Sequence, residues 1–149
     1  MTRCIAFTGG VGGAKLVLGL TQILPPKELL IAVNTGDDFE HLGLTICPDI
    51  DTVIYTLAGI SNPDTGWGRK QESWKTMKTL ESLGGETWFK LGDQDLALHL
   101  ARRHQMILGA TLTEITADLA NKLNVHHPIV PMSDYPVRTM ILTEKGEMP

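Results

Sequence analysis

The 149-residue sequence contains little cysteine, few aromatic residues and no long hydrophobic run. Its two cysteines, Cys4 and Cys47, are too few for the disulfide framework of a small secreted protein, which favours a reducing, cytoplasmic compartment. No apolar run is long enough to span a bilayer, and this argues against a membrane protein. The net charge of −4 argues against a nucleic-acid-binding protein.

The chain opens with an apolar run, a glycine cluster and an apolar-periodic segment. This pattern predicts a strand at 3–7, a helix at 13–24 and a second strand at 29–33. Such an opening predicts parallel pairing of the two strands, and the length fits a single domain. We therefore predict an α/β fold for residues 1–149, a Rossmann-like three-layer nucleotide-binding domain with a mainly parallel sheet.

Turn residues, proline breaks and helix caps divide the rest of the chain into further elements. The predicted elements are a polar loop at 34–48, a short helix at 53–57 with acidic residues before it, a turn-rich stretch at 59–68, helices at 72–83, 94–108 (with Asp93 as N-cap) and 111–123, a proline-broken loop at 126–136 and a strand at 137–142. The sequence stops where a partner strand would begin, so we expect a C-terminal half of the fold beyond it.

Four glycines and a lysine follow the first predicted strand and extend into the start of the first predicted helix. They are Gly9, Gly10, Gly12, Gly13 and Lys15. Backbone N–H groups in such a loop approach a phosphate closely, and the helix N-terminus favours negative charge, so we predict a phosphate site. A tight turn without a ligand is the alternative. The loop matches neither the dinucleotide fingerprint, because Lys15 occupies its last glycine position, nor the P-loop, which needs serine or threonine after the lysine.

Acidic residues follow the second predicted strand. Asp37 and Asp38 come directly after it, and Asp49 and Asp51 precede the next predicted helix. Because ligands bind at the carboxyl ends of strands in open α/β sheets, the glycine loop and the Asn34–Asp38 loop should lie side by side. Carboxylates beside a phosphate site suit Mg²⁺, which predicts phosphoryl or nucleotidyl transfer. A solvated turn at Asp37 and Asp38 and a helix cap at Asp49 are the alternatives.

Three further residues are candidates for ligand contact. Lys90 precedes a predicted helix and could bind an anion or a heteroaromatic carbonyl group. Trp67 lies on a glycine-rich loop and could either stack on a flat ring or anchor the loop on the core. His41 lies close to the acidic loop and is a candidate for substrate contact. No histidine has a partner at metal-ligand spacing, so we predict no zinc site.

Several of these motifs occur together in one known family. In chain order they are Thr8–Lys15, Asn34–Asp38, Ile46–Thr52, Gly66–Gly68, Lys90–Leu96 and Pro131–Asp134. Over nearly its whole length the sequence resembles the 2-phospho-L-lactate transferase family, called CofD in archaea and FbiA in mycobacteria. Family members are considerably longer, which implies that these residues are an N-terminal part and that they lack transferase activity alone.

The resemblance implies a Mg²⁺-dependent transferase in the biosynthesis of the deazaflavin coenzyme F-420. The implied donor is lactyl-2-diphospho-5′-guanosine or its enolpyruvyl counterpart. The implied acceptor is the deazaflavin Fo, whose terminal ribityl hydroxyl attacks the phosphorus while GMP leaves. A homodimer is also implied. The alternatives are a non-catalytic nucleotide-sugar-binding regulator of the YvcK-like group and an NAD-dependent oxidoreductase.

Matching motifs carry the family's functional residues onto this sequence. The resemblance implies that Asp51 contacts Fo or the metal, that Asp37 is a second metal ligand, and that Lys90 contacts Fo. The glycine loop would hold the diphosphate of the donor. Asp37 and Asp51 are thus the predicted catalytic residues, with Lys15 and Trp67 as further predicted substrate contacts.

Overall fold

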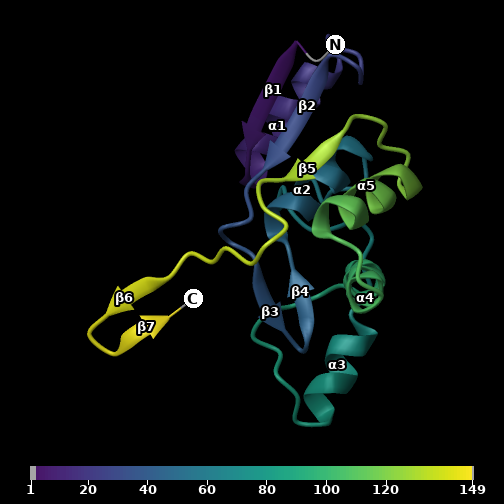
Figure 1. The fold of residues 1–149 in the computed structure, drawn as a ribbon. Helices are drawn as coiled ribbons and strands as arrows, with labels where there is room; N and C mark the ends of the chain where they lie inside the picture. Colours follow the sequence, from purple (N-terminus) through teal and green to yellow (C-terminus); the bar gives the residue numbers. More distant parts are fainter. Residues whose placement is uncertain (1–2, 149) are drawn as a thin grey trace.

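The central sheet of the protein has three parallel strands (Figure 1). The computed structural model describes residues 3–148. β1 (Cys4–Thr8) pairs with β2 (Leu29–Val33), which pairs in turn with β5 (Ile129–Pro131). α1 (Gly10–Thr21) connects the first two strands. The predicted α/β fold is confirmed as a parallel sheet flanked by helices, which is part of a Rossmann-like fold.

Helices pack around this sheet and form the main hydrophobic core with it. α2 (Pro48–Leu57) packs against α1, and α5 (Leu112–Lys122) packs against β5. Four of the five residues of the central strand β2 are buried, as expected for a parallel strand covered on both faces. Within residues 3–148, no helix has the length and apolar character needed to cross a membrane.

A β-hairpin lies inside the segment predicted as a polar loop at 34–48. β3 (Phe39–His41) pairs antiparallel with β4 (Leu44–Ile46). Leu42 and Gly43 form the turn with φ of +54° and +73°, the conformation of tight hairpin turns. The sequence prediction misses the hairpin because its strands are too short to show alternation and leucine is uncommon at positive φ.

Two further helices exchange N-terminal caps. α3 (Lys75–Ser82) and α4 (Asp93–Ile107) correspond to the helices predicted at 72–83 and 94–108. Glu72, just before α3, accepts hydrogen bonds from the backbone N–H groups of Gln94 and Asp95 at 2.9 Å each. These N–H groups have no partner within their own helix, so the Glu72 carboxylate caps α4.

Asp93 makes the reciprocal cap. Its carboxylate accepts hydrogen bonds from the Ser73 hydroxyl at 2.5 Å and from the backbone N–H of Thr76 at 3.0 Å, at the start of α3. The prediction that Asp93 caps its own helix is wrong, because Gly92 is the N-cap residue of α4 and Asp93 turns toward α3 instead. These hydrogen bonds lower the pKa of Asp93 from 3.8 to about 2.

Asp93→Asn should therefore loosen the first turn of α3. Because the folded pKa lies below the ordinary value, the contribution of Asp93 to stability is present above pH 3.8 and is lost as the pH falls through about 2. We expect faster amide exchange at Thr76 in the variant at neutral pH, and a difference in melting temperature from wild type that shrinks toward pH 2. Glu81→Gln, exposed on the same helix, is the control and should change neither. Wild-type exchange in Asp93→Asn would contradict the cap.

The C-terminal segment forms a hairpin that projects from the body of the molecule (Figure 1). β6 (Ile141–Thr143) pairs with β7 (Gly146–Met148), so the strand predicted at 137–142 forms only at its end. β5 was predicted as part of the proline-broken loop at 126–136. It is an edge strand of the sheet in the described residues, and proline is tolerated in such a strand.

Candidate functional site

Two loops meet at the carboxyl ends of β1 and β2. The backbone N–H of Asn34 donates to the carbonyl oxygen of Thr8 at 2.8 Å. The glycine loop, Gly9–Gly13, and the acidic loop, Asn34–Asp38, therefore lie side by side, as predicted. Gly10 has a φ of +62°, in the left-handed region that glycine tolerates best.

Asp49 connects the two loops. Its carboxylate accepts hydrogen bonds from the backbone N–H of Gly10 at 2.8 Å and from the side-chain amide of Asn34 at 2.9 Å. A Cβ atom on Gly9 would lie 2.8 Å from the same carboxylate, so this glycine permits the close approach. Asp49 thus caps α1 rather than its own helix, while Gly12 and Lys15 remain exposed at the start of α1.

An open cavity of about 510 Å³ lies beside the acidic loop. Its walls include the rings of Phe39 and Trp88, whose centroids are 5.8 Å apart, and the side chain of Arg138. The backbone N–H of Thr139 donates to the carbonyl oxygen of Gly36 at 2.6 Å, which holds the C-terminal segment against the acidic loop. The cavity therefore combines aromatic walls with charge of both signs.

The two neighbouring aspartates of the acidic loop have opposite surroundings. Asp37 is exposed and accepts hydrogen bonds from Asn34 at 3.0 Å and from the Thr139 hydroxyl at 3.3 Å. Asp38 is only 4% exposed, and its Oδ1 atom has no hydrogen-bond partner in the described residues. Burial raises the pKa of Asp38 from 3.8 to about 7. A buried carboxylate oxygen without a partner is costly, and because Asp38 is one of the residues that line the cavity, this oxygen points to a ligand there.

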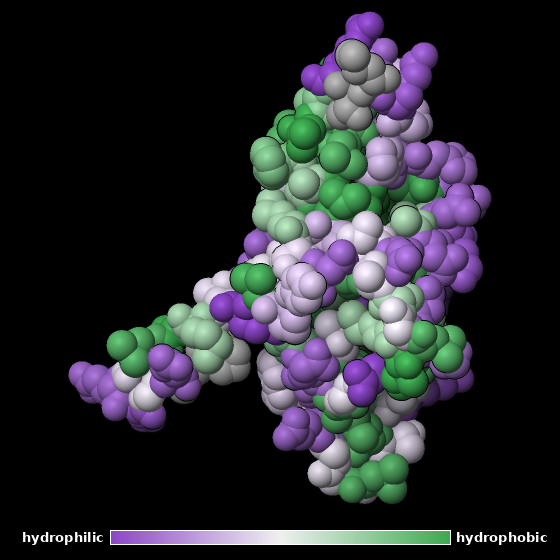
Figure 2. All heavy atoms as spheres, in the orientation of Figure 1, coloured by the Kyte–Doolittle hydropathy of each residue, from purple (hydrophilic) through white to green (hydrophobic). Residues whose placement is uncertain are grey.

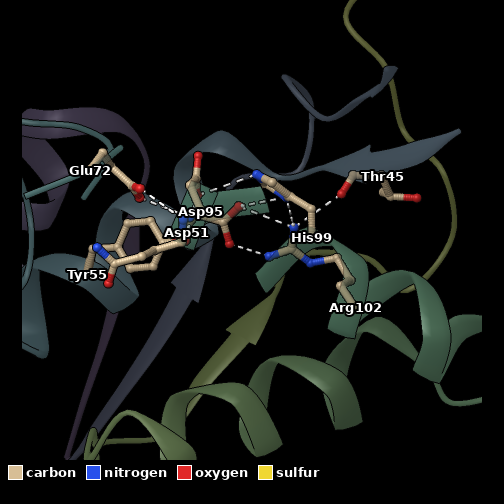
Figure 3. A network of polar contacts seen from close by, with 8 residues as sticks. Thr45, Asp51, Tyr55, Glu72, Asp95, His99 and Arg102 are labelled. Atoms are coloured by element: carbon tan, nitrogen blue, oxygen red, sulfur yellow. Dashed lines mark hydrogen bonds and ion pairs between the residues drawn. The ribbon is translucent and has the colours of Figure 1, made fainter. Parts of the chain in front are cut away.

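A smaller cavity, about 190 Å³, lies over a network of buried polar side chains (Figure 3). Asp51 from α2 lines this cavity and pairs with Arg102 from α4 through both carboxylate oxygens. Trp67 lies on the cavity wall, half exposed. The Asp95 carboxylate accepts a hydrogen bond from the Tyr55 hydroxyl at 2.6 Å.

Opposing effects set the pKa of Asp95 in this network. Burial alone would raise it, but the neighbouring His99 and the hydrogen bond from Tyr55 lower it below its ordinary value. Burial and the nearby carboxylates raise the pKa of Tyr55. Near neutral pH, Asp95 is therefore ionised and Tyr55 keeps its proton as a hydrogen-bond donor.

Comparison with known proteins gives the family. The sequence model of 2-phospho-L-lactate transferase CofD matches residues 4–148. The chain belongs to the CofD family. It is 40% identical over 141 residues to a phosphoenolpyruvate transferase of Kitasatospora aureofaciens, covering 93% of this chain and 44% of that protein. It is also 40% identical over 144 residues to a 2-phospho-L-lactate transferase of Methanosarcina mazei, covering 97% and 48%. The chain spans about half the length of the curated relatives it matches.

The predicted site residues of this CofD-family chain lie in separate places. Asp37 lines the larger cavity, and Asp51 and Trp67 line the smaller one. Lys90 lines a different depression beside α3, and Lys15 lies exposed on α1. The roles predicted for these residues and for the glycine loop stay predictions.

The acidic loop fits a magnesium ion better than Asp51 does. Within residues 3–148, no three His, Cys, Asp or Glu side chains stand close enough together to hold a metal ion. Two carboxylates suffice for Mg²⁺, which usually keeps several waters and binds substrate phosphates. Asp38 has an oxygen without a partner, beside the exposed Asp37. Both oxygens of Asp51 accept hydrogen bonds from Arg102.

Neither Arg102 nor His99 was predicted from the sequence to belong to a site. Arginine is almost never fully buried unless paired, so its burial is not expected from sequence. One signal was present: Asp95, His99 and Arg102 follow one another at spacings of four and three, which puts them on one helix face. His41 is also buried, with its ring 5.0 Å from that of Trp88.

Proposed function

We propose that this chain is the N-terminal part of a transferase of coenzyme F-420 biosynthesis. The proposed reaction moves the phospho-lactyl or phospho-enolpyruvyl group from a guanylylated donor to the deazaflavin Fo. The terminal ribityl hydroxyl oxygen forms a bond to the phosphorus and releases its proton. The bond between that phosphorus and GMP breaks, and GMP leaves with the electron pair.

Membership of the CofD family supports this reaction class. The relatives named as phosphoenolpyruvate transferases and those named as 2-phospho-L-lactate transferases are about equally similar to this chain, at 40% identity in the two cases above. Overall similarity therefore does not select between the enolpyruvyl and lactyl donors. The proposal covers both.

The observation that carries the proposal is Asp38, a residue of the larger cavity's lining whose buried Oδ1 atom has no hydrogen-bond partner in the described residues. Asp37 and Asp38 would hold Mg²⁺, which when bound neutralises the charge that develops on the transferred phosphoryl group. Phe39 and Trp88 would bind a flat ring, since aromatic side chains stack on such ligands. Arg138, on the same wall, would attract the anionic donor.

The glycine loop lies next to the acidic loop, since the backbone N–H of Asn34 donates to the carbonyl oxygen of Thr8. We propose that its exposed part, around Gly12 and Lys15, holds the donor diphosphate. Gly9 and Gly10 would contribute by keeping the loop close to Asp49. The other half of the relatives' length would complete the pocket, and dimerisation would belong to that complete protein.

Apolar side chains of the central sheet are exposed on β1, where a longer chain would cover them. Ile5 and Phe7 of β1 are 53% and 72% exposed. Figure 2 shows hydrophobic residues gathered over this end of the molecule. Exposed apolar side chains on a central sheet are unusual in a soluble domain, so this surface supports the proposal that the 149 residues are part of a longer α/β protein.

Fo binding tests the proposed function directly. The full-length gene product that carries this sequence should change the fluorescence of Fo on titration, with saturation at one Fo per chain. A nucleotide sugar serves as the competing ligand. Binding of the nucleotide sugar without binding of Fo would contradict the transferase and favour the regulator.

A further inference from the structure

Three elements meet at one buried guanidinium group (Figure 3). Arg102, on α4, is 1% exposed and donates to both oxygens of Asp51 in the first turn of α2. Its Nη1 atom also lies 3.1 Å from the carbonyl oxygen of Thr45 in β4, to which it donates. A fork of two donors on a carboxylate fixes the plane of that carboxylate. The orientation of Asp51 therefore depends on the position of Arg102.

A second set of contacts holds Arg102 in that position. Its Nη1 atom lies 3.0 Å from Nδ1 of His99, one turn earlier on α4. A guanidinium only donates, so Nδ1 accepts, and the proton of the neutral ring is assigned to Nε2. Nε2 lies 3.5 Å from Oδ1 of Asp95, the oxygen that also accepts from the Tyr55 hydroxyl. The polar contacts thus form a continuous series from Asp51 to Tyr55.

A network of buried charged groups is not the most stable way to fill this part of the core. Burying charged groups costs free energy, and well-packed apolar residues often give equal or greater stability. The network holds two carboxylates, Asp51 and Asp95, and one guanidinium, Arg102, so the guanidinium matches the charge of only one carboxylate. Asp51, Tyr55, Asp95 and His99 all line the cavity of about 190 Å³, so the charge faces a space that a ligand can enter.

We propose that Arg102 is a positioning residue, which together with His99 fixes the Asp51 carboxylate toward the acceptor molecule in the smaller cavity. This inference rests on the proposed function, since the acceptor is taken to be Fo. Arg102 does not touch the ligand and acts through Asp51. Partners that orient the ligands of metal sites change affinity or activity by about 10- to 100-fold when they are replaced, and we expect an effect of the same size for Arg102.

Arg102→Lys separates positioning from the simple supply of a buried positive charge. Lysine keeps the charge but replaces the fork with a single ammonium group. Fo affinity is measured by fluorescence in EDTA with the full-length gene product, and kcat and KM for transfer are measured with Mg²⁺. We expect Arg102→Lys to bind Fo about 10- to 100-fold more weakly than wild type. Near-UV circular dichroism gives the concentration of folded protein, on which the affinity is based. Arg103→Lys is the matched control, because Arg103 is the exposed neighbour on the same helix, and it should bind as wild type does.

Wild-type Fo affinity in a folded Arg102→Lys variant would overturn the positioning role and leave the proposed function standing. If Arg102→Lys does not fold, His99→Gln decides, because it keeps the charges of the ion pair and removes the ring acceptor. Unchanged affinity in His99→Gln would then overturn the proposal, and weakened affinity would support it. Wild-type protein that binds no Fo would overturn the proposed function, and the positioning role with it.

Discussion

Asp38→Asn should lower transfer by at least about 100-fold in the full-length protein. The variant keeps the size of the side chain but loses the negative charge that we assign to Mg²⁺ binding. Calorimetric titration should show that the variant has lost Mg²⁺ binding, and this measurement does not depend on activity. The control is Asp64→Asn, an exposed aspartate in a turn, which should change neither the transfer rate nor Mg²⁺ binding.

The same variant should be more stable than wild type at pH 8 when divalent cations are removed. Burial raises the pKa of Asp38 from 3.8 to about 7, so between these values the folded protein holds a proton that the unfolded chain has lost. Wild-type stability therefore falls as the pH rises from about 4 to 7, by up to about 4 kcal/mol for three pKa units. Asparagine carries no charge and avoids this cost.

Denaturant unfolding in EDTA at pH 4 and pH 8 measures the stability effect. We expect Asp38→Asn to exceed wild type at pH 8 and to match it near pH 4. A variant that is less stable at both pH values would show that the Asp38 carboxylate has a structural partner. Greater stability together with lost transfer is typical of a residue kept for function.

Asp51→Asn should have the largest effect on stability. It leaves the Arg102 guanidinium buried beside a neutral amide, and breaking a buried pair in this way costs about 3–5 kcal/mol. The loss should appear as a lower denaturant midpoint. Asp118→Asn is the control, since it breaks an exposed pair with Lys122 and should cost no more than about 1 kcal/mol.

A double variant separates stability from binding at the Asp51 site. Asp51→Leu combined with Arg102→Met removes both buried charges, so most of the lost stability should return. Fo binding should not return, because the carboxylate is gone. Recovery of both stability and Fo binding would contradict a role for Asp51 in the site.

The elements that the sequence predicted best are those with local signals. β1, α1 and β2 have an apolar run, a glycine turn and helical periodicity in direct succession. The helix predicted at 111–123 also formed, as α5, and it begins with a capping box in which the Glu114 backbone N–H lies 3.2 Å from the Thr111 hydroxyl. The hairpin β3–β4 and the strand β5 have three residues per strand and depend on tertiary packing, which local pattern does not reveal.

The site was predicted less completely for a similar reason. Asp37 and Asp38 are neighbours in the sequence, yet one is exposed and the other buried. That difference arises from packing against the rest of the chain, which buries Asp38 and raises its pKa to about 7. Asp51 was identified from the family motif, but its pairing with Arg102 joins residues 51 positions apart. Contacts of such separation have no local signature in a single sequence.

Transfer by the full-length gene product is the direct test of the proposed reaction. The protein is incubated with Fo, Mg²⁺ and either lactyl-2-diphospho-5′-guanosine or its enolpyruvyl counterpart, and products are resolved by mass spectrometry. We expect one GMP for each phospho-lactyl or phospho-enolpyruvyl Fo formed, and no product in EDTA. Absence of product with both donors, from folded protein at saturating Fo and Mg²⁺, would contradict the proposed reaction.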